Sequence, residues 1–155
     1  MSEPSWLAIA RAEVDVAACP AGSNNPRITQ YHAGTNIEGY DDKVSWCSSF
    51  INWTLGQAGI AGTSSALARS WLEWGQCLDT PVSGCIAVLW REEPESWKGH
   101  VGYFLRQEGR SIILLGGNQL GAVREHRYGM ETVLSYRWPK NMQLPDGKRP
   151  EPDGA

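Results

Sequence analysis

The first half of the chain carries apolar residues at helical spacing. After Cys47, apolar or small residues follow the i, i+3, i+4, i+7, i+8 pattern of one helical face, and Gly59 stands where the helix should end. This face consists of Phe50, Ile51, Thr54, Leu55 and Ala58. A mixed helical pattern covers 6–16, and 27–33 predicts a short helix or turn. Residues 67–72 predict a further helix that begins at Ser64 or Ser65 and ends at Gly75.

The period of the apolar positions changes after Pro81. Short runs of β-type residues cover 85–90, 100–105, 111–115, 123–128 and 132–138, and residues 107–110 have the composition of a hairpin turn. Helices followed by strands with short connections are typical of an α+β domain. We therefore expect N-terminal helices packed on an antiparallel sheet of about five strands.

The end of the chain has a different composition. From residue 140 it is rich in proline, glycine and charged residues, which is typical of a flexible tail. We expect a single domain over 1–139 and a tail over 140–155. A chain of 155 residues can bury a core without disulfide support.

Charge and hydropathy restrict the classes of partner. The formal net charge is −3 and there is no run of Lys and Arg, which argues against nucleic acid or an anionic membrane as a partner. No apolar run approaches the roughly 18 residues of a membrane span. Glu3, Glu13 and Asp15 stand where a signal peptide would be basic and apolar. We expect synthesis in the cytoplasm without a signal peptide, so a site of action outside it requires another route.

The cysteines and histidines do not form a recognisable metal motif. Four cysteines and three histidines are scattered without zinc-site spacing, so we expect no metal and no cofactor. Cys77 and Cys85 flank a loop, and the sequence does not decide whether they form a disulfide.

Cys47 lies in the first turn of its predicted helix. Free backbone N–H groups and the helix dipole favour a thiolate there, which lowers the pKa of cysteine from about 8.5. The alternative is a small buried hydrophobic residue. Asp41 and Asp42 mark the helix entry, and small polar Ser48 and Ser49 follow the thiol, which favours an accessible nucleophile.

A histidine and an amide complete the candidate site. His100 begins a predicted strand, where Gly99 and Gly102 leave its imidazole uncrowded, and we expect it to be the base for Cys47. A third residue must orient that imidazole. The next strand ends in GGNQ, and a hairpin would place Asn118 beside the imidazole N–H. The alternative is a plain turn with Gly and Asn at positive φ.

These blocks resemble a known family. NPRITQYH, WCSSFINWTLGQAGIAGTSSALARSWLEWG, GHVGYFL, GGNQ and YRWP together resemble bacterial and phage cell-wall hydrolases related to CHAP and NlpC-type cysteine peptidases. The resemblance covers about residues 6–139 and implies a papain-like fold with Cys47 as nucleophile, His100 as base and acid, and Asn118 as the orienting residue. It departs at Gly84-Cys85 and at Cys19, where such sequences often carry acidic residues.

The resemblance also implies a substrate. Members of the family are endolysins, or amidase effectors injected into rival bacteria, that cut peptide bonds in peptidoglycan. We therefore expect the peptidoglycan stem peptide as the substrate, a monomeric enzyme acting at the cell wall after export or holin release, and a cognate immunity protein if the protein is a toxin. Candidate substrate-binding residues are Trp46, Ser48, Trp74 and Trp97.

Two other classes of function remain open. A tryptophan-rich module that binds cell-wall glycan would keep its cysteine for packing and show no thiol reactivity. An intracellular cysteine transferase or deamidase would use the same cysteine, histidine and amide on a different acceptor.

Overall fold

The computed structural model describes residues 3–20, 22–42 and 45–144, and it confirms an α+β fold. The elements run, in chain order, α1 Ser5–Arg11, α2 Pro26–His32, α3 Cys47–Gln57, the 3₁₀ helix η1 Ala68–Glu73, β1 Gln76–Leu78, β2 Ile86–Trp90, β3 Gly99–Glu108, β4 Ser111–Gln119, β5 Ala122–Gly129, the 3₁₀ helix η2 Met130–Thr132, and β6 Val133–Trp138. No described helix is long and apolar enough to cross a bilayer.

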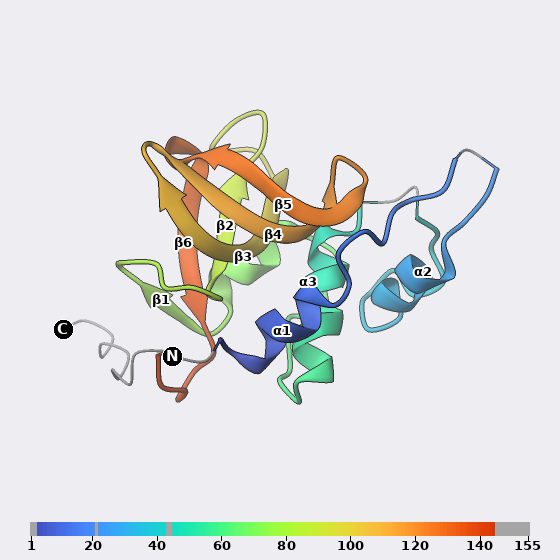
Figure 1. The fold of residues 1–155 in the computed structure, drawn as a ribbon, viewed down its shortest axis with the longest axis horizontal. Helices are drawn as coiled ribbons and strands as arrows, with labels where there is room; N and C mark the ends of the chain where they lie inside the picture. Colours follow the sequence, from blue (N-terminus) through green and yellow to red (C-terminus); the bar gives the residue numbers. More distant parts are fainter. Residues whose placement is uncertain (1–2, 21, 43–44, 145–155) are drawn as a thin grey trace.

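One antiparallel sheet contains all the described strands. Its order is β1-β6-β2-β3-β4-β5, so β6 crosses back to lie between β1 and β2. The residue Leu89 on β2 pairs with His100 on one side and with Val133 on the other. Val133, the first residue of β6, therefore lies across β2 from His100, near the start of β3. Figure 1 shows β5 passing over the sheet before the chain descends through β6.

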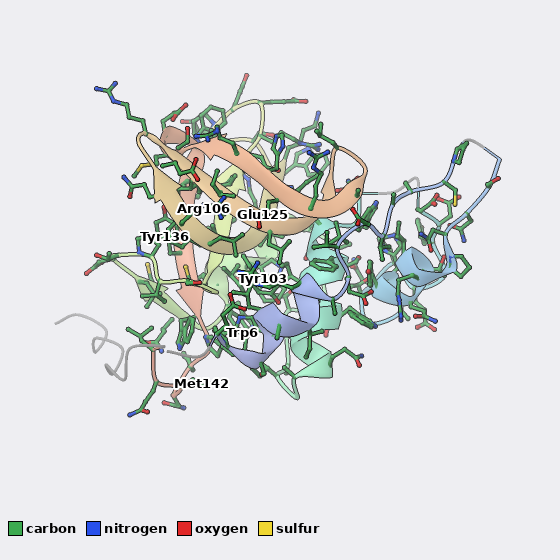
Figure 2. The ribbon with its side chains drawn as sticks, viewed as in Figure 1. Trp6, Tyr103, Arg106, Glu125, Tyr136 and Met142 are labelled. Carbon is green, nitrogen blue, oxygen red and sulfur yellow. The ribbon has the colours of Figure 1, made fainter. Side chains whose placement is uncertain are left out.

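The central helix α3 connects the helices to the sheet. It contacts β3 and β4 of the sheet, and it also contacts α1 and α2 (Figure 1). Tyr103 on β3, labelled in Figure 2, joins its hydroxyl to Oγ1 of Thr54 on α3 at 2.6 Å. Both residues are fully buried, so this bond sets the distance between helix and sheet without exposing a polar group.

The core is rich in large aromatic side chains. Trp6, Trp46, Trp71 and Trp138 are at most 2% exposed, so half of the eight tryptophans are buried core residues. Trp6 donates its indole N–H to the Gly84 carbonyl at 2.8 Å and packs edge-on against Trp138. Trp6 thereby fixes helix α1 to β6, the strand that ends at Trp138.

Several boundaries differ from the sequence-based expectation. Helix α1 ends at Arg11 because Asp15 adopts φ 83° and its amide bonds to the Val123 carbonyl, so the chain continues along the edge of β5. The predicted helix near residue 70 is a six-residue 3₁₀ turn. The sheet has six strands rather than five, because the three-residue β1 is too short to show an alternation.

The prediction of a C-terminal tail over 140–155 stays a prediction. Residues 145–155 of the expected tail lie outside the described residues. Before them, the Met142 carbonyl accepts a hydrogen bond from the Trp138 indole at 3.1 Å. The chain just after residue 139 therefore packs on the end of β6.

Candidate active site

Cys47 is the first residue of α3, and its side chain is 3% exposed. The helix begins here, with the Phe50 amide bonded to the Trp46 carbonyl at 2.9 Å. Trp46 makes no side-chain cap, so first-turn amides keep no intrahelical acceptor. The positive end of the helix dipole therefore faces the sulfur.

The approach to Cys47 is fixed by buried polar groups. His32 on α2 is fully buried, with Nδ1 2.7 Å from Oγ of Ser49 and Nε2 3.1 Å from the Asp41 carbonyl. The Asp42 carboxylate accepts the amides of Cys19 and Asn25 at 2.8 and 2.9 Å. These bonds hold the segment on both sides of residues 43–44 and so the start of α3.

The sulfur lies where β3 and β4 separate. The Phe104 amide bonds to β2 at the Cys85 carbonyl, so by alternation the Val101 amide points toward β4. The β3–β4 ladder, however, begins only at Tyr103, opposite Leu115. The Val101 N–H is therefore free of the ladder and donates to the Cys47 sulfur.

Cys47 and His100 are hydrogen-bonded, and each shifts the pKa of the other toward its charged form. Burial raises the pKa of the Cys47 thiol, but the charge and hydrogen bond of His100, with bonds from Val101 and Ser45, bring it below its ordinary value. Burial lowers the pKa of His100, but the Cys47 charge and bonds to Cys47 and Gln119 raise it overall, against the charge of Arg91. Both shifts favour a thiolate beside an imidazolium.

The residue on the far side of the imidazole is Gln119, and this corrects the expectation for Asn118. Oε1 of Gln119 lies 2.9 Å from Nε2 of His100. The Gln119 amide nitrogen donates to the carbonyls of Leu114 and Arg124 at 3.1 and 2.5 Å. Both of its hydrogens are thus used, which fixes the amide orientation and makes Oε1 an acceptor of an Nε2–H. Nδ1 of His100 is then the nitrogen that faces Cys47.

A bulge in β4 explains the one-residue difference. The β4–β5 register shifts between Gly116 and Gln119, and Asn118 lies in the left-handed region at φ 57°. An extra residue in one strand reverses the alternation of the side chains that follow it. The sequence motif GGNQ was therefore correctly placed, but the residue that meets His100 is its last one.

Three glycines make room for this arrangement. A Cβ at Gly116 would lie 2.8 Å from Oε1 of Gln119, and a Cβ at Gly102 would lie 3.4 Å from the same atom. A Cβ at Gly117 would meet Phe50 at 2.7 Å and Trp46 at 2.8 Å. The absence of a side chain at Gly102 and Gly116 thus leaves space for the Gln119 amide. Its absence at Gly117 lets the start of α3 pack closely against β4.

Tyr128 on β5 is a contact that sequence reasoning missed. Its hydroxyl oxygen lies 3.0 Å from Nε2 of His100, and the two rings lie 5.1 Å apart at 31°. Ser45 and the Val101 amide were also missed. No local pattern marks any of them, since each depends on how distant segments meet.

The predicted substrate-binding residues lie in different environments. Trp46 is fully buried against Gly117, and Ser48 is fully buried, donating to the Ser65 carbonyl at 2.6 Å and accepting from the Trp71 indole at 2.8 Å. Both expectations are therefore wrong: these side chains pack the core because the inner face of α3 begins at its first turn.

The other two predicted substrate-binding residues are tryptophans. Trp74 is half-buried and donates its indole N–H to the Ala61 carbonyl at 3.0 Å. Trp97 is 68% exposed. It lies three residues before His100, in the β2–β3 connection.

The remaining cysteines are separate from the site. Cys19, Cys77 and Cys85 are free thiols. Cys77 and Cys85 therefore do not form the disulfide that the sequence left undecided. Burial raises the pKa of the Cys85 thiol to about 12, which makes it a poor nucleophile. Across the described ranges, no three or more His, Cys, Asp or Glu side chains are grouped as a metal site.

The comparisons with known proteins support the fold. No protein-family model and no curated protein sequence matches the chain. Among solved structures, the chain resembles a protein described as similar to lipoprotein, NLP/P60 family, from Staphylococcus aureus subsp. aureus Mu50. The TM-score is 0.53 at 15% identity, over 90% of this chain and 44% of that one. The chain thus spans less than half of that protein's length, and the likeness is one of fold.

Proposed function

We propose that this chain is a cysteine peptidase or amidase that cuts peptide bonds in peptidoglycan, with Cys47 as nucleophile, His100 as base and acid, and Gln119 as the orienting residue. The observation that carries the proposal is the contact of Cys47 with His100, in which the pKa of the thiol is lowered and that of the imidazole is raised. A cysteine kept only for packing would show the opposite direction, as Cys85 does. The contrast favours an enzyme over a glycan-binding module.

The geometry supports acyl transfer in two steps. The Cys47 thiolate attacks the peptide carbonyl carbon and forms a C–S bond, while the His100 imidazolium gives its Nδ1 proton to the departing amine. Water then attacks the thioester, the neutral imidazole takes its proton, and the carboxylic acid leaves. The thiolate and imidazolium are restored, and no cofactor is required.

The developing oxyanion has donors close to the sulfur. Cys47 is the first residue of α3, so its own amide has no intrahelical acceptor. The Ser45 hydroxyl already bonds to the sulfur, and the residue is exposed to solvent. An oxyanion-hole donor of this kind typically contributes about 3 kcal/mol to the transition state.

Trp97 is the proposed substrate platform. The connection that carries it is held by Arg69, whose guanidinium donates to the carbonyls of Lys98, Pro94 and Glu93 at 2.8, 2.9 and 3.1 Å. An exposed indole on a connection held this firmly offers a flat apolar surface that needs little ordering when substrate binds. Its position three residues before His100 suits the stem peptide or the sugar that bears it.

The biological setting belongs to the same proposal. The enzyme is synthesised in the cytoplasm and reaches the cell wall through a secretion machine, as a toxin, or through a holin, as an endolysin. A toxin requires an immunity protein in the producing cell, and we propose that it acts as a monomer. Neighbouring genes for holins or for secretion and immunity proteins distinguish the two settings.

Digestion of purified sacculi tests the chemistry. Wild-type protein should release soluble fragments with new amino termini, measured by mass analysis, and Cys47→Ala should release none. The matched control is Cys77→Ala, which removes an exposed thiol on β1 and should digest like wild type. Digestion by Cys47→Ala at the wild-type rate contradicts the nucleophile assignment.

The product distinguishes hydrolysis from other cysteine chemistry. Cleavage adds one water and separates the stem peptide into two fragments. A gain of about one mass unit in an intact glutamine-containing peptide or protein identifies a deamidase instead. Binding to sacculi without either product, together with an unreactive Cys47, identifies the glycan-binding module.

A further inference from the structure

Tyr128 reaches His100 across the sheet and not along a neighbouring strand. In the ladder, Tyr128 pairs with Ile112 on β4, which pairs with Gln107 on β3, seven residues beyond His100. The contact exists because the sheet curls. Trp90, at the end of β2, donates its indole N–H to the Glu131 carbonyl in η2 at 3.1 Å, which holds the end of β5 over the start of β3.

The hydrogen atoms around Nε2 decide what the Tyr128 hydroxyl does. Because the Gln119 nitrogen is fully used by two carbonyls, Oε1 requires a hydrogen on Nε2. A protonated Nε2 has no lone pair to accept a bond, so the Tyr128 oxygen at 3.0 Å accepts a share of the same N–H. The imidazole edge away from Cys47 thus has two oxygen acceptors.

We propose that Tyr128 is a positioning residue for His100, whose hydroxyl oxygen stabilises the protonated Nε2 edge and whose ring fixes the imidazole plane against the Cys47 sulfur. The inference rests on the proposed function, because it assumes that the Cys47–His100 pair is the reacting pair. Two oxygen acceptors stabilise an imidazolium more than a neutral ring, since hydrogen bonds to a charged group are stronger.

The charged and titratable neighbours of His100 set the size of the effect. Cys47 on α3 favours the imidazolium, and Arg91 after β2 opposes it. On β5, His126 packs edge-on to Tyr128 at 5.0 Å, and the charge of His100 is one of the causes that lower its pKa. Because the Arg91 cation opposes the imidazolium and His126 is held in its neutral form, a neutral oxygen acceptor at Nε2 offsets part of the repulsion from Arg91.

The substitution Tyr128→Phe keeps the ring and removes the oxygen. Without that acceptor the imidazolium is less stable, so less thiolate forms at low pH and the acidic limb of the alkylation profile moves to higher pH. We expect a fall in kcat of about tenfold, the loss of one hydrogen bond to a charged group, with little change in KM. A residue that only packs would lower the amount of folded protein and leave the limb in place.

The experiment measures iodoacetamide labelling of Cys47 against pH, read by peptide mass analysis, in wild type, Tyr128→Phe and Tyr136→Phe. Tyr136 is the matched control, a half-buried tyrosine on β6 whose ring packs against Phe104. A limb shifted to higher pH in Tyr128→Phe alone supports the inference. An identical limb in wild type and Tyr128→Phe overturns it.

A second measurement does not depend on substrate or on yield of a variant. The chain has three histidines, so ¹⁵N-histidine labelling of wild-type protein resolves the His100 ring. We expect Nε2 of His100 to remain protonated through neutral pH, and the opposite tautomer overturns the inference. A wild-type Cys47 that labels like an ordinary thiol overturns the proposed function itself, which separates the two failures.

Discussion

The side-chain oxygen of Gln119 lies 2.9 Å from Nε2 of His100, and the bonds of its amide nitrogen to Leu114 and Arg124 make it an acceptor there. A rotating amide could satisfy either tautomer of the imidazole, whereas this one satisfies only the tautomer that leaves Nδ1 for Cys47. The orientation of the candidate base is therefore set by backbone carbonyls of β4 and β5.

Removing that amide should impair catalysis more than folding. We expect Gln119→Ala to lower kcat/KM by about a hundredfold, because a freed imidazole leaves the productive pose. The matched control is Asn118→Gly, which removes the neighbouring amide and suits φ 57° without strain. Sacculus digestion measures both, and equal losses would return the orienting role to Asn118.

The sequence predicted most of the elements and the position of Cys47 at a helix start because those features are local. The spacing after Cys47 predicts the inner face of α3, and the first-turn position of the thiol follows from it. The runs that became β2 to β6 show their apolar pattern directly. Such periodic features need no knowledge of tertiary contacts.

The remaining parts of the site depend on contacts between distant segments. The bulge between Gly116 and Gln119 reverses the side-chain alternation, and a bulge is a property of strand pairing. Tyr128 reaches His100 only because the sheet curls. Trp46 looked available for substrate because an aromatic residue beside a thiol has no burial signal of its own, yet it is fully buried.

The thiolate of Cys47 should depend on His100. The imidazolium charge and hydrogen bond lower the pKa of the thiol, so His100→Ala should raise it. Iodoacetamide labelling near pH 6 should then fall sharply, while labelling above the free-cysteine pKa of about 8.5 should change little. Hydrolysis should fall by about a hundredfold or more. With His126→Ala as the control, an unchanged labelling profile in His100→Ala contradicts the ion pair.

Alanine substitutions at the two adjacent glycines of β4 should have different effects, one on activity and the other on stability. In Gly116→Ala the new methyl displaces only the end of the Gln119 side chain, so activity should fall while the melting temperature changes little. In Gly117→Ala it meets Phe50 and Trp46 within the core, which should cost about 1–3 kcal/mol of unfolding free energy.

A glycine with open space around it provides the control for both. Gly56, in the last turn of α3, has nothing within 4 Å of an added Cβ. Gly56→Ala should therefore stabilise the protein slightly and leave activity unchanged. Thermal unfolding and sacculus digestion of the three variants test the distinction, and equal activity and stability losses at Gly116 and Gly117 would contradict it.

The hydrogen bonds from Arg69 to the β2–β3 connection that carries Trp97 should affect substrate binding and not the chemical step. Arg69→Met keeps the length and the apolar stem of the side chain but removes the three bonds to backbone carbonyls, so the connection should loosen. We expect KM to rise by about tenfold while kcat is retained, because Arg69 has no contact with Cys47 or His100 among the described hydrogen bonds. Arg110→Met, in the distant β3–β4 hairpin, is the matched control.

A double-mutant cycle decides whether Arg69 works through Trp97. If the guanidinium only holds the indole in place, Trp97→Ala should raise KM by itself, and adding Arg69→Met should change KM little further. Additive effects on KM would mean that Arg69 and Trp97 serve the substrate independently. A drop in kcat for Arg69→Met, with slower labelling of Cys47 as well, would instead mean that Arg69 helps to position His100. That histidine is two residues after Lys98, whose carbonyl Arg69 binds.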